Sequence, residues 1–410
     1  MAGPLEGIRV IEWAGFHNGP AAGYMLGDLG AEVIKIEEPV RGDPMRGMTQ
    51  MYGDAMTLPG GRLANFELAN RNKRGITVDL TQEKGRQIVY RLVEKADVFF
   101  TNYYRNEVLQ RVGMDYETMV KYNPRLIYAI NSAYGLEGPL GNERGFDTIA
   151  QARTGLMWAM GDRDTEEPVQ VVGAPCDQMG ATMLTYAIMA ALLARERQGI
   201  AQKVEVSLLG SALHLQGIGV NVASLRGRAY ARHSQKRARN PMGNHYQCGD
   251  GKWLILAEPQ SDRFWSQFCH IMGMEELEND PRFSSALGGR REHYAELIEI
   301  LSRLFLTRTR DEWLALFAEK GAEFAYSPIY DYSEALADPQ VLENEYLTDF
   351  DHPTLGKVKF LNTPIKFSQT PAGPVREAPE LGQHTEEVLT EFLGYSWEEV
   401  AQLKEDGAIG

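Results

Sequence analysis

The sequence has few cysteines and no long apolar run. Its three cysteines, Cys176, Cys248 and Cys269, are neither closely paired nor set among histidines. This spacing argues against a disulfide framework and against a zinc site, so we expect reduced thiols. No stretch approaches the length that spans a bilayer, and the first residues lack the basic and then apolar pattern of a leader. We therefore expect a cytoplasmic protein without a membrane partner.

The chain also lacks a surplus of basic residues. It carries 42 Lys and Arg against 56 Asp and Glu, which gives a formal charge of −14. Nucleic-acid binding requires a basic surface, so this balance argues against it. No Gly-x-Gly-x-x-Gly follows the first apolar segment, and no Gly-x-x-x-x-Gly-Lys-Ser/Thr occurs. These absences argue against a nicotinamide-dependent oxidoreductase and against a P-loop protein.

What the sequence does contain is a regular alternation of short apolar runs and amphipathic segments. We expect strands at 8–13, 33–36, 76–78, 98–101, 126–130 and 204–206, with helices that include 82–95 and 116–121. This rhythm predicts a mainly parallel sheet with helices on both faces. In such sheets, ligands bind beyond the carboxyl ends of the strands, which here means the loops after Trp13, Glu37, Thr101 and Asn131.

The length of 410 residues allows two or three domains. Near residue 225 the sequence becomes basic and rich in turn residues, and amphipathic helices follow up to about residue 322. We expect a large domain over 1–220 and a small domain over 225–330. A C-terminal segment, 331–410, is expected to return to the large domain.

Asp177 is the first candidate for chemistry. It follows Gly173, Ala174, Pro175 and Cys176, and it precedes an apolar helix that we expect from Gln178 onward. A carboxylate at this position would cap free backbone N–H groups and stay charged beside the positive end of the helix dipole. Such a carboxylate can act as a nucleophile, whereas the plainer interpretation is a helix cap. A redox or acyl-accepting thiol at Cys176 is a further alternative.

A basic cluster precedes the predicted strand at 76–78. Arg71, Lys73 and Arg74 place three cations within four residues. In an acidic protein such a loop can bind a polyphosphate, and it can equally be a solvated turn. Arg105, Arg111 and Arg144 lie in or near other loops on the side where we expect ligands.

Taken together, these segments resemble the class III CoA-transferases, and the similarity extends over nearly the whole chain. Each string is weak alone, but their order and spacing are specific. The strings that carry the resemblance are 5–12, Gly19-Pro20, 29–37, 70–74, 96–98, 123–128, Gly145-Phe146-Asp147, Asp177 with its helix up to Arg195, 204–208, 250–253 and 382–385.

The resemblance implies an α/β fold class: a large domain with a Rossmann-like parallel sheet, a smaller α+β domain and an interlocked homodimer. It implies that Asp177 attacks an acyl-CoA and then carries CoA, as an aspartyl thioester, to a carboxylic acid acceptor. Succinyl-CoA is one of the donors that the resemblance implies. Coenzyme A is then a co-substrate, and neither a metal nor a permanent cofactor is expected. The CoA-binding positions that the resemblance implies are Phe16, His17, Asn18, Ala69, Asn70, Arg71, Asn72, Lys73, Arg74, Asn102, Tyr103, Tyr104, Arg111 and Arg144.

The chain departs from this family at two places. Glu38 stands where some relatives carry a basic residue, and Ala257-Glu258-Pro259-Gln260 stands where some carry a run of glycines. The second change predicts a less flexible loop near the intermediate, because proline restricts the backbone.

Two other functions compete with CoA transfer. An α-methylacyl-CoA racemase would need a histidine where this chain has Phe146, and a phenyl ring cannot transfer a proton. A non-catalytic CoA-binding protein would use Asp177 only as a cap.

Overall fold

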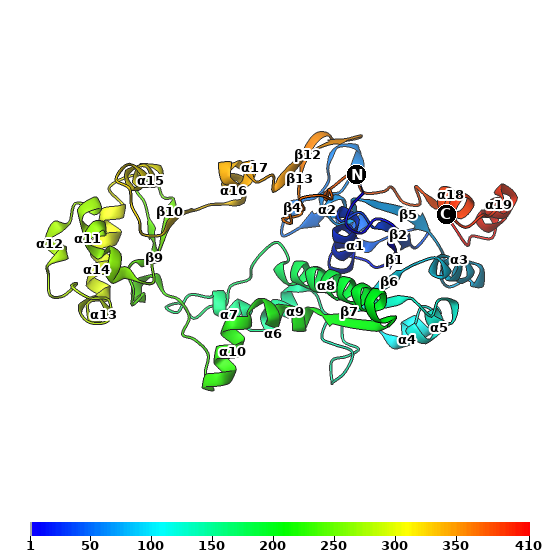
Figure 1. The fold of residues 1–410 in the computed structure, drawn as a ribbon, viewed down its shortest axis with the longest axis horizontal. Helices are drawn as coiled ribbons and strands as arrows, with labels where there is room; N and C mark the ends of the chain where they lie inside the picture. The colour runs from blue at the N-terminus through cyan, green and yellow to red at the C-terminus, as the bar shows by residue number, and fades with distance from the viewer. Residues whose placement is uncertain (1) are drawn as a thin grey trace. The chain divides into compact units, whose positions relative to one another are not determined.

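Residues 2–410 are described by a computed structural model, and the chain forms two units (Figure 1). The first unit contains the residues up to Met157 together with Gln170–Ala229 and Glu343–Gly410. The second contains Trp158–Val169 and Tyr230–Leu342.

A six-stranded sheet forms the centre of the first unit, and all its strand pairs are parallel. This confirms the predicted parallel α/β architecture. From edge to edge the strands are β5 (Lys73–Thr77), β2 (Glu32–Glu37), β1 (Arg9–Trp13), β6 (Val98–Thr101), β7 (Ile127–Ser132) and β8 (Lys203–Ser207). The strand order therefore reverses between β1 and β6, and a crevice for ligands is expected at such a switch point.

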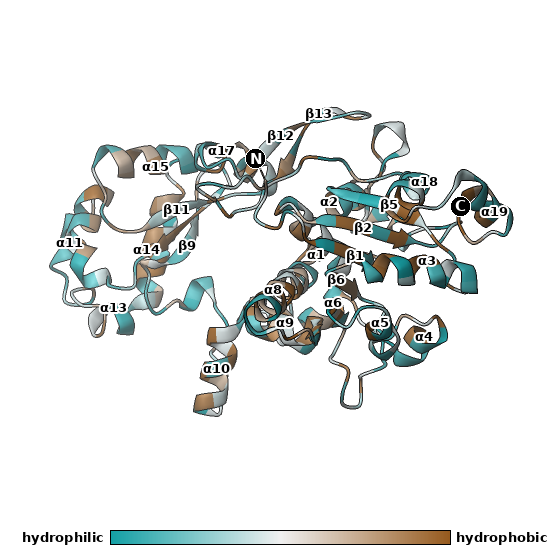
Figure 2. Ribbon diagram, turned by 45° about the vertical axis from the view of Figure 1, so that its right-hand side comes forward, coloured by the Kyte–Doolittle hydropathy of each residue, from teal (hydrophilic) through white to brown (hydrophobic). Residues whose placement is uncertain are grey.

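Helices cover both faces of this sheet, since side chains alternate along each strand. Val10, Val98 and Ala129 pack on one face against α1 (Asn18–Asp28) and α8 (Pro175–Gln198). The opposite face packs against α3 (Glu83–Glu94), α5 (Tyr116–Tyr122) and the C-terminal elements α18 (Thr385–Glu387), η4 (Val388–Phe392) and α19 (Trp397–Glu405). The brown apolar segments of β1 and β2 lie between these helices (Figure 2).

The second unit has its own core around an antiparallel sheet. The strands run in the order β11 (Tyr326–Ile329), β10 (Trp253–Ala257) and β9 (Gly243–Gln247). Buried side chains of α11 (Ser261–Met272), α14 (Tyr294–Phe305) and α15 (Arg310–Glu319) pack against this sheet.

Shorter elements connect these layers. In the first unit and at its boundaries they are η1 (Pro44–Gly47), β3 (Gln50–Met51), β4 (Asp54–Ala55), η2 (Pro59–Gly61), α2 (Ala64–Asn70), α4 (Asn106–Arg111), α6 (Asp147–Arg153), α7 (Leu156–Met160), α9 (Leu208–Leu215), α10 (Gly217–Arg226), α17 (Pro339–Glu343), β12 (Leu347–His352) and β13 (Gly356–Leu361). In the second unit they are η3 (Gln235–Arg237), α12 (Glu275–Glu278), α13 (Gly289–Glu292) and α16 (Tyr332–Ala337).

Two predicted boundaries are wrong in ways that affect the site. The third strand begins at Lys73 rather than at residue 76, so Lys73 and Arg74 belong to the sheet and not to a loop. The long helix begins at Pro175 rather than at Gln178, because proline fits the first helical position. Asp177 therefore lies inside the first helical turn.

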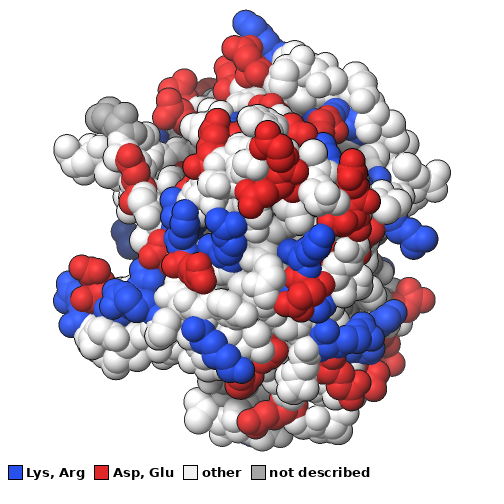
Figure 3. All heavy atoms as spheres, turned by 90° about the vertical axis from the view of Figure 1, so that its right-hand side faces the viewer, with Lys and Arg blue, Asp and Glu red and all other residues white. Residues whose placement is uncertain are grey.

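Within residues 2–410, no single helix has both the length and the apolar character needed to cross a bilayer, although α9 and α10, which are bent by 83°, pass that test together. On the face shown in Figure 3, acidic and basic side chains are interspersed.

Candidate active site

The loops after β1 and β6 meet at the switch point of the sheet. Gly15 N–H donates to Asn102 Oδ1 at 3.1 Å, and Asn102 Nδ2 donates to Gly15 O at 2.7 Å. A Cβ atom on Gly15 would lie 2.7 Å from the Tyr103 hydroxyl, so only glycine allows this approach. This paired contact brings Phe16 and Asn18 beside the segment from Asn102 to Arg105.

Asp177 is presented by the start of α8. Gly173 and Ala174 both have left-handed backbones, with φ of 90° and 54°, which turn the chain into the helix. The carboxylate of Asp147 serves as the missing cap: its Oδ1 accepts from Cys176 N at 2.7 Å and from Asp177 N at 3.1 Å. Asn18 Nδ2 donates to Asp177 O at 3.2 Å. Asp177 is thus not the cap, and its own carboxylate is left free for chemistry.

The charge state of Asp177 differs from the prediction. Burial, followed by the nearby charge of Asp147, raises the pKa of Asp177 from 3.8 to about 7. The helix N-terminus was expected to favour the charged form, but desolvation outweighs it here. A carboxyl group with a pKa near 7 remains substantially ionised at neutral pH and is more basic than an ordinary aspartate.

The neighbouring cysteine does not share this reactivity. Cys176 is fully buried, and burial, with further contributions from Asp147 and Asp177, raises the pKa of its thiol to about 12. Since the thiolate is the nucleophile, burial and the raised pKa both argue against a redox or acyl-accepting role for Cys176.

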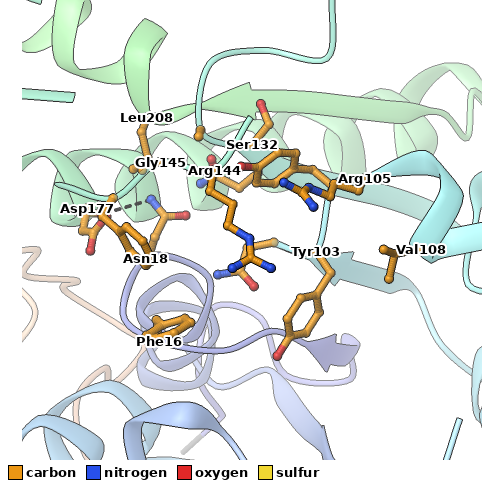
Figure 4. Close-up of a pocket in the computed structure, with 15 residues that line it drawn as sticks. Phe16, Asn18, Tyr103, Arg105, Val108, Ser132, Arg144, Gly145, Asp177 and Leu208 are labelled. Atoms are coloured by element: carbon orange, nitrogen blue, oxygen red, sulfur yellow. Dashed lines mark hydrogen bonds between the residues drawn. The ribbon is translucent and has the colours of Figure 1, made fainter. Parts of the chain in front are cut away.

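A cavity of about 400 Å³ opens at Asp177 (Figure 4). Asp177 and Asn18 lie side by side at one end of the close-up, and Arg144 and Arg105 extend across the cavity from them. Neither guanidinium forms an ion pair with any residue in 2–410, so both are available to an anion. The lining residues are Phe16, Asn18, Asn102, Tyr103, Tyr104, Arg105, Val108, Asn131, Ser132, Ala133, Arg144, Gly145, Phe146, Asp177 and Leu208. No group of three His, Cys, Asp or Glu side chains that could hold a metal occurs in the described part of the chain.

The cavity gathers about half of the positions predicted for the site. Asp177, Phe16, Asn18, Asn102, Tyr103, Tyr104 and Arg144 all line it. His17 does not. Its Nε2 lies 3.2 Å from Gln178 Oε1, and burial lowers its pKa, so the ring is neutral and braces the start of α8. Arg111 is exposed at the end of α4 and is not among the lining residues.

The segment from Ala69 to Arg74 is occupied by internal contacts. Arg71 Nη2 pairs with the buried Asp28 at 2.6 Å, and Asn72 Nδ2 donates to the same carboxylate at 2.7 Å. Arg74 pairs with Glu32 and Glu387. The Nζ of Lys73 is surrounded by carbonyl and carboxylate acceptors: Glu12 Oε1 at 3.0 Å, Pro20 O at 2.8 Å, Ala69 O at 2.9 Å and Asn70 Oδ1 at 2.9 Å. No residue of this segment lines the cavity.

Three site residues were not assigned from the sequence. Arg105 appeared only as one of several loop cations, and Asp147 only as part of a family string. Tyr52 gave no signal at all. It lies in the turn between β3 and β4 with a φ of 52°, and the nearby backbone of Gly173 and Ala174 partly offsets the rise in its pKa. Burial and the charge of Asp147 raise the pKa of Tyr52.

The two positions that depart from the family pattern are also defined, as is Phe146, which stands where a racemase would carry its histidine. Glu38 accepts from Val40 N at 3.1 Å and from Arg41 N at 2.6 Å, so its carboxylate binds the turn that follows it. Phe146 is exposed, and its ring meets Phe16 edge to face with centroids 5.6 Å apart. In the second unit, β10 ends at Ala257, and Glu258 Oε1 accepts from Gln260 N at 2.9 Å. The loop at 257–260 is therefore braced by its own glutamate.

Fold and site together define an α/β protein whose cavity contains the carboxylate of Asp177 and two guanidinium groups without an ion pair among the described residues. The model of CoA-transferase family III matches residues 5–385. Curated relatives include (R)-2-hydroxy-4-methylpentanoate CoA-transferase of Clostridioides difficile, which is 31% identical over 99% of both chains. They also include succinyl-CoA–D-citramalate CoA-transferase of Chloroflexus aurantiacus, 32% identical over 98% of this chain and 97% of the relative. Mouse (Mus musculus) succinyl-CoA:glutarate CoA-transferase is 32% identical over 99% of this chain and 90% of the relative.

Among solved structures, a CAIB/BAIF family protein from Brucella suis superposes with a TM-score of 0.83 at 29% identity, covering 95% of this chain and 100% of that one. The chain belongs to CoA-transferase family III. It is an enzyme that transfers CoA between an acyl-CoA and a carboxylic acid.

Proposed function

We propose that Asp177 is the nucleophile and carries CoA as an aspartyl thioester. The observation that supports this is its free carboxylate, at the end of a cavity that also contains two unpaired arginines. A carboxylate oxygen of Asp177 attacks the thioester carbonyl and expels CoA thiolate, which leaves a mixed anhydride. The thiolate then attacks the Asp177 carbonyl and releases the donor acid as a carboxylate.

The second half of the cycle reverses these steps. The acceptor carboxylate attacks the aspartyl thioester and expels CoA thiolate, which then attacks the acceptor carbonyl and regenerates the Asp177 carboxylate. Two easier displacements replace one exchange between carboxylates. The raised pKa of Asp177 suits this role, because a more basic carboxylate is a better nucleophile than one with a pKa near 4.

We assign CoA binding to the side of the cavity away from Asp177. Arg105 and Arg144 would pair with phosphate oxygens, since charge-assisted contacts to guanidinium groups are strong. Asn102, Tyr103 and Tyr104 would line the path of the pantetheine arm towards Asp177. Arg71, Lys73 and Arg74 take a structural role in this assignment, because each is already paired.

For the substrates we propose succinyl-CoA as a donor and a short carboxylic acid as the acceptor. Two of the relatives use succinyl-CoA by name, and two act on 2-hydroxy acids, 2-hydroxy-4-methylpentanoate and citramalate. The cavity wall near Asp177 combines apolar Phe16, Phe146 and Leu208 with polar Asn18 and Asn131. Such a wall fits an acid that has both an apolar and a hydrogen-bonding part.

We further propose that the enzyme works as an interlocked homodimer. None of the residues of α10 is buried, and Ile218 and Leu225 are 80% and 86% exposed. Tyr186 and Leu193 of α8 are exposed as well. A second copy of the chain would cover these apolar side chains. Folded, active monomers at high dilution in sedimentation experiments would contradict this assembly.

The substitution Asp177→Ala tests the proposed function. Transfer of CoA from succinyl-CoA to a panel of carboxylic acids should fall by at least about 1000-fold, as expected when a nucleophile is removed. Affinity for free CoA, measured by calorimetry, should stay within about threefold. Unchanged transfer would refute the assignment. Rapid exchange of the α proton of a 2-methylacyl-CoA in deuterated water would instead support the racemase alternative.

A further inference from the structure

Phe16 occupies a strained position on the wall of the cavity. Its φ is +61°, a left-handed conformation that side chains other than glycine rarely adopt. Such a backbone is strained and persists only when its surroundings enforce it. The ring of Phe16 lines the cavity and meets Phe146 edge to face. What holds Phe16 in place therefore shapes the cavity beside Asp177.

The backbone N–H of Phe16 is held by a buried aspartate. Asp43, which is only 3% exposed, accepts from Phe16 N at 2.9 Å through Oδ1, and the same oxygen accepts from Met45 N at 2.9 Å. The N–H of Asp43 donates to Glu37 Oε2 at 2.9 Å, which ties its own backbone to the end of β2. Asp43 does not line the cavity, so it reaches the site only through Phe16.

The other oxygen of Asp43 pairs with a fully buried lysine. Lys35 Nζ donates to Asp43 Oδ2 at 2.9 Å, to Glu12 Oε1 at 3.0 Å and to Ala14 O at 2.8 Å. Burial alone would lower the pKa of Lys35, but the charges of Asp43 and Glu12 raise it overall, so the ammonium group stays protonated.

Lys35 and Asp43 thus hold the loop on both sides of Gly15. Lys35 binds the carbonyl of Ala14, and Asp43 binds the N–H of Phe16. Asn102 completes the clamp with its two bonds to Gly15. Backbone groups of Ala14, Gly15 and Phe16 are therefore held by side chains from three other segments.

We propose that Lys35 and Asp43 are positioning residues of the transferase, which hold Phe16 in its left-handed conformation and so set the cavity wall beside Asp177. Neither residue touches the substrate. The proposal rests on the proposed function, in that the cavity is taken as the acyl-CoA site. A fully buried ion pair contributes little net stability compared with apolar side chains of similar size, so its main effect here is on geometry.

The first test replaces both Lys35 and Asp43, so that neither is left as an unpaired buried charge. In the variant Lys35→Met/Asp43→Leu, apolar side chains replace the ion pair, and the melting temperature should fall only because the N–H groups of Phe16 and Met45 lose their acceptor. The N–H of Phe16 then has no partner, and kcat/KM with succinyl-CoA should fall by about 10- to 100-fold. The single variant Asp43→Asn retains an acceptor oxygen for Phe16 N, and its kcat/KM should stay within about threefold.

Asp115→Ala is the matched control. Asp115 is also buried and accepts a backbone N–H, from Thr118 at 3.0 Å, but it does not line the cavity. This variant should lose stability and keep its KM. A purely structural role for Asp43 predicts instead that activity follows melting temperature in every variant, and that result would overturn the proposal.

A double-mutant cycle with Phe16→Gly tests the route of action. Glycine adopts positive φ without strain, so the clamp has nothing to enforce in that background. Adding Lys35→Met/Asp43→Leu to Phe16→Gly should then change kcat/KM by less than about threefold, which is strong non-additivity. Equal losses in both backgrounds would contradict the proposal. The same four variants are also compared by their affinity for CoA. This comparison tests the positioning role even if Asp177→Ala shows that another residue is the nucleophile.

Discussion

Asp147→Asn should shift the pH dependence of the enzyme towards acid. Burial and then the charge of Asp147 raise the pKa of Asp177 from 3.8 to about 7. Because burial is the larger cause, the charge of Asp147 accounts for less than half of this rise, about one pH unit or roughly 1.4 kcal/mol. The amide oxygen of an asparagine can still accept from Cys176 N and Asp177 N, so the helix start should be preserved.

The assay is kcat/KM with succinyl-CoA across pH, which reports groups of the free enzyme. Asp177 must be ionised to attack, so the rate rises with pH up to its pKa. In Asp147→Asn the acid limb should move down by about one pH unit, while Asp115→Asn, a helix cap outside the cavity, leaves it in place. An acid limb that does not move in Asp147→Asn would refute the electrostatic coupling of the two carboxylates.

Three further changes test the site. The pKa of Asp177 is higher in the folded than in the unfolded chain, so its ionisation lowers the stability of the fold as pH rises from about 4 to 7. Asp177→Asn removes this cost and should raise the melting temperature at about pH 8 but not at about pH 4. Arg144→Ala should raise KM for acyl-CoA about 10- to 100-fold with little change in kcat. The control is Arg303→Ala, because Arg303 forms an exposed ion pair with Glu299 on a helix, and it should change neither constant. Equal KM values in the two variants would contradict phosphate binding by Arg144. Arg71→Ala leaves the buried Asp28 without its ion pair and should cost about 3–5 kcal/mol of unfolding free energy while KM stays within about threefold; a large KM increase would return Arg71 to the CoA site.

The layers of the fold could be predicted because they follow from local patterns. The apolar run at 98–101 became β6 with the same bounds, and the alternation of strands and helices produced the parallel sheet. The strand order could not be predicted in this way, since it depends on contacts between distant segments. Lys73 illustrates the limit: a lysine in a polar string was predicted for a loop, but its pairing with Glu12, 61 residues earlier, places it inside β5.

The site was predicted less completely for a similar reason. Asp177 was a candidate from its place before an apolar helix, and the family resemblance gave it the role of nucleophile. The rise in its pKa could not be predicted, because burial cannot be seen in the sequence. Asp147 caps α8 from 30 residues away, whereas cap signals are read within a few positions of a helix start. Phe16 was predicted for the site, but nothing local indicated that Asp43 and Lys35 hold it.

The most direct test of the account is to trap the covalent intermediate. The enzyme is incubated with succinyl-CoA and quenched with hydroxylamine or borohydride, and its peptides are examined by mass spectrometry. The account predicts a hydroxamate or a reduced side chain at Asp177 alone, and none in Asp177→Asn. Modification of Asp147 or Cys176 instead, or transfer activity with no modified peptide, would contradict it.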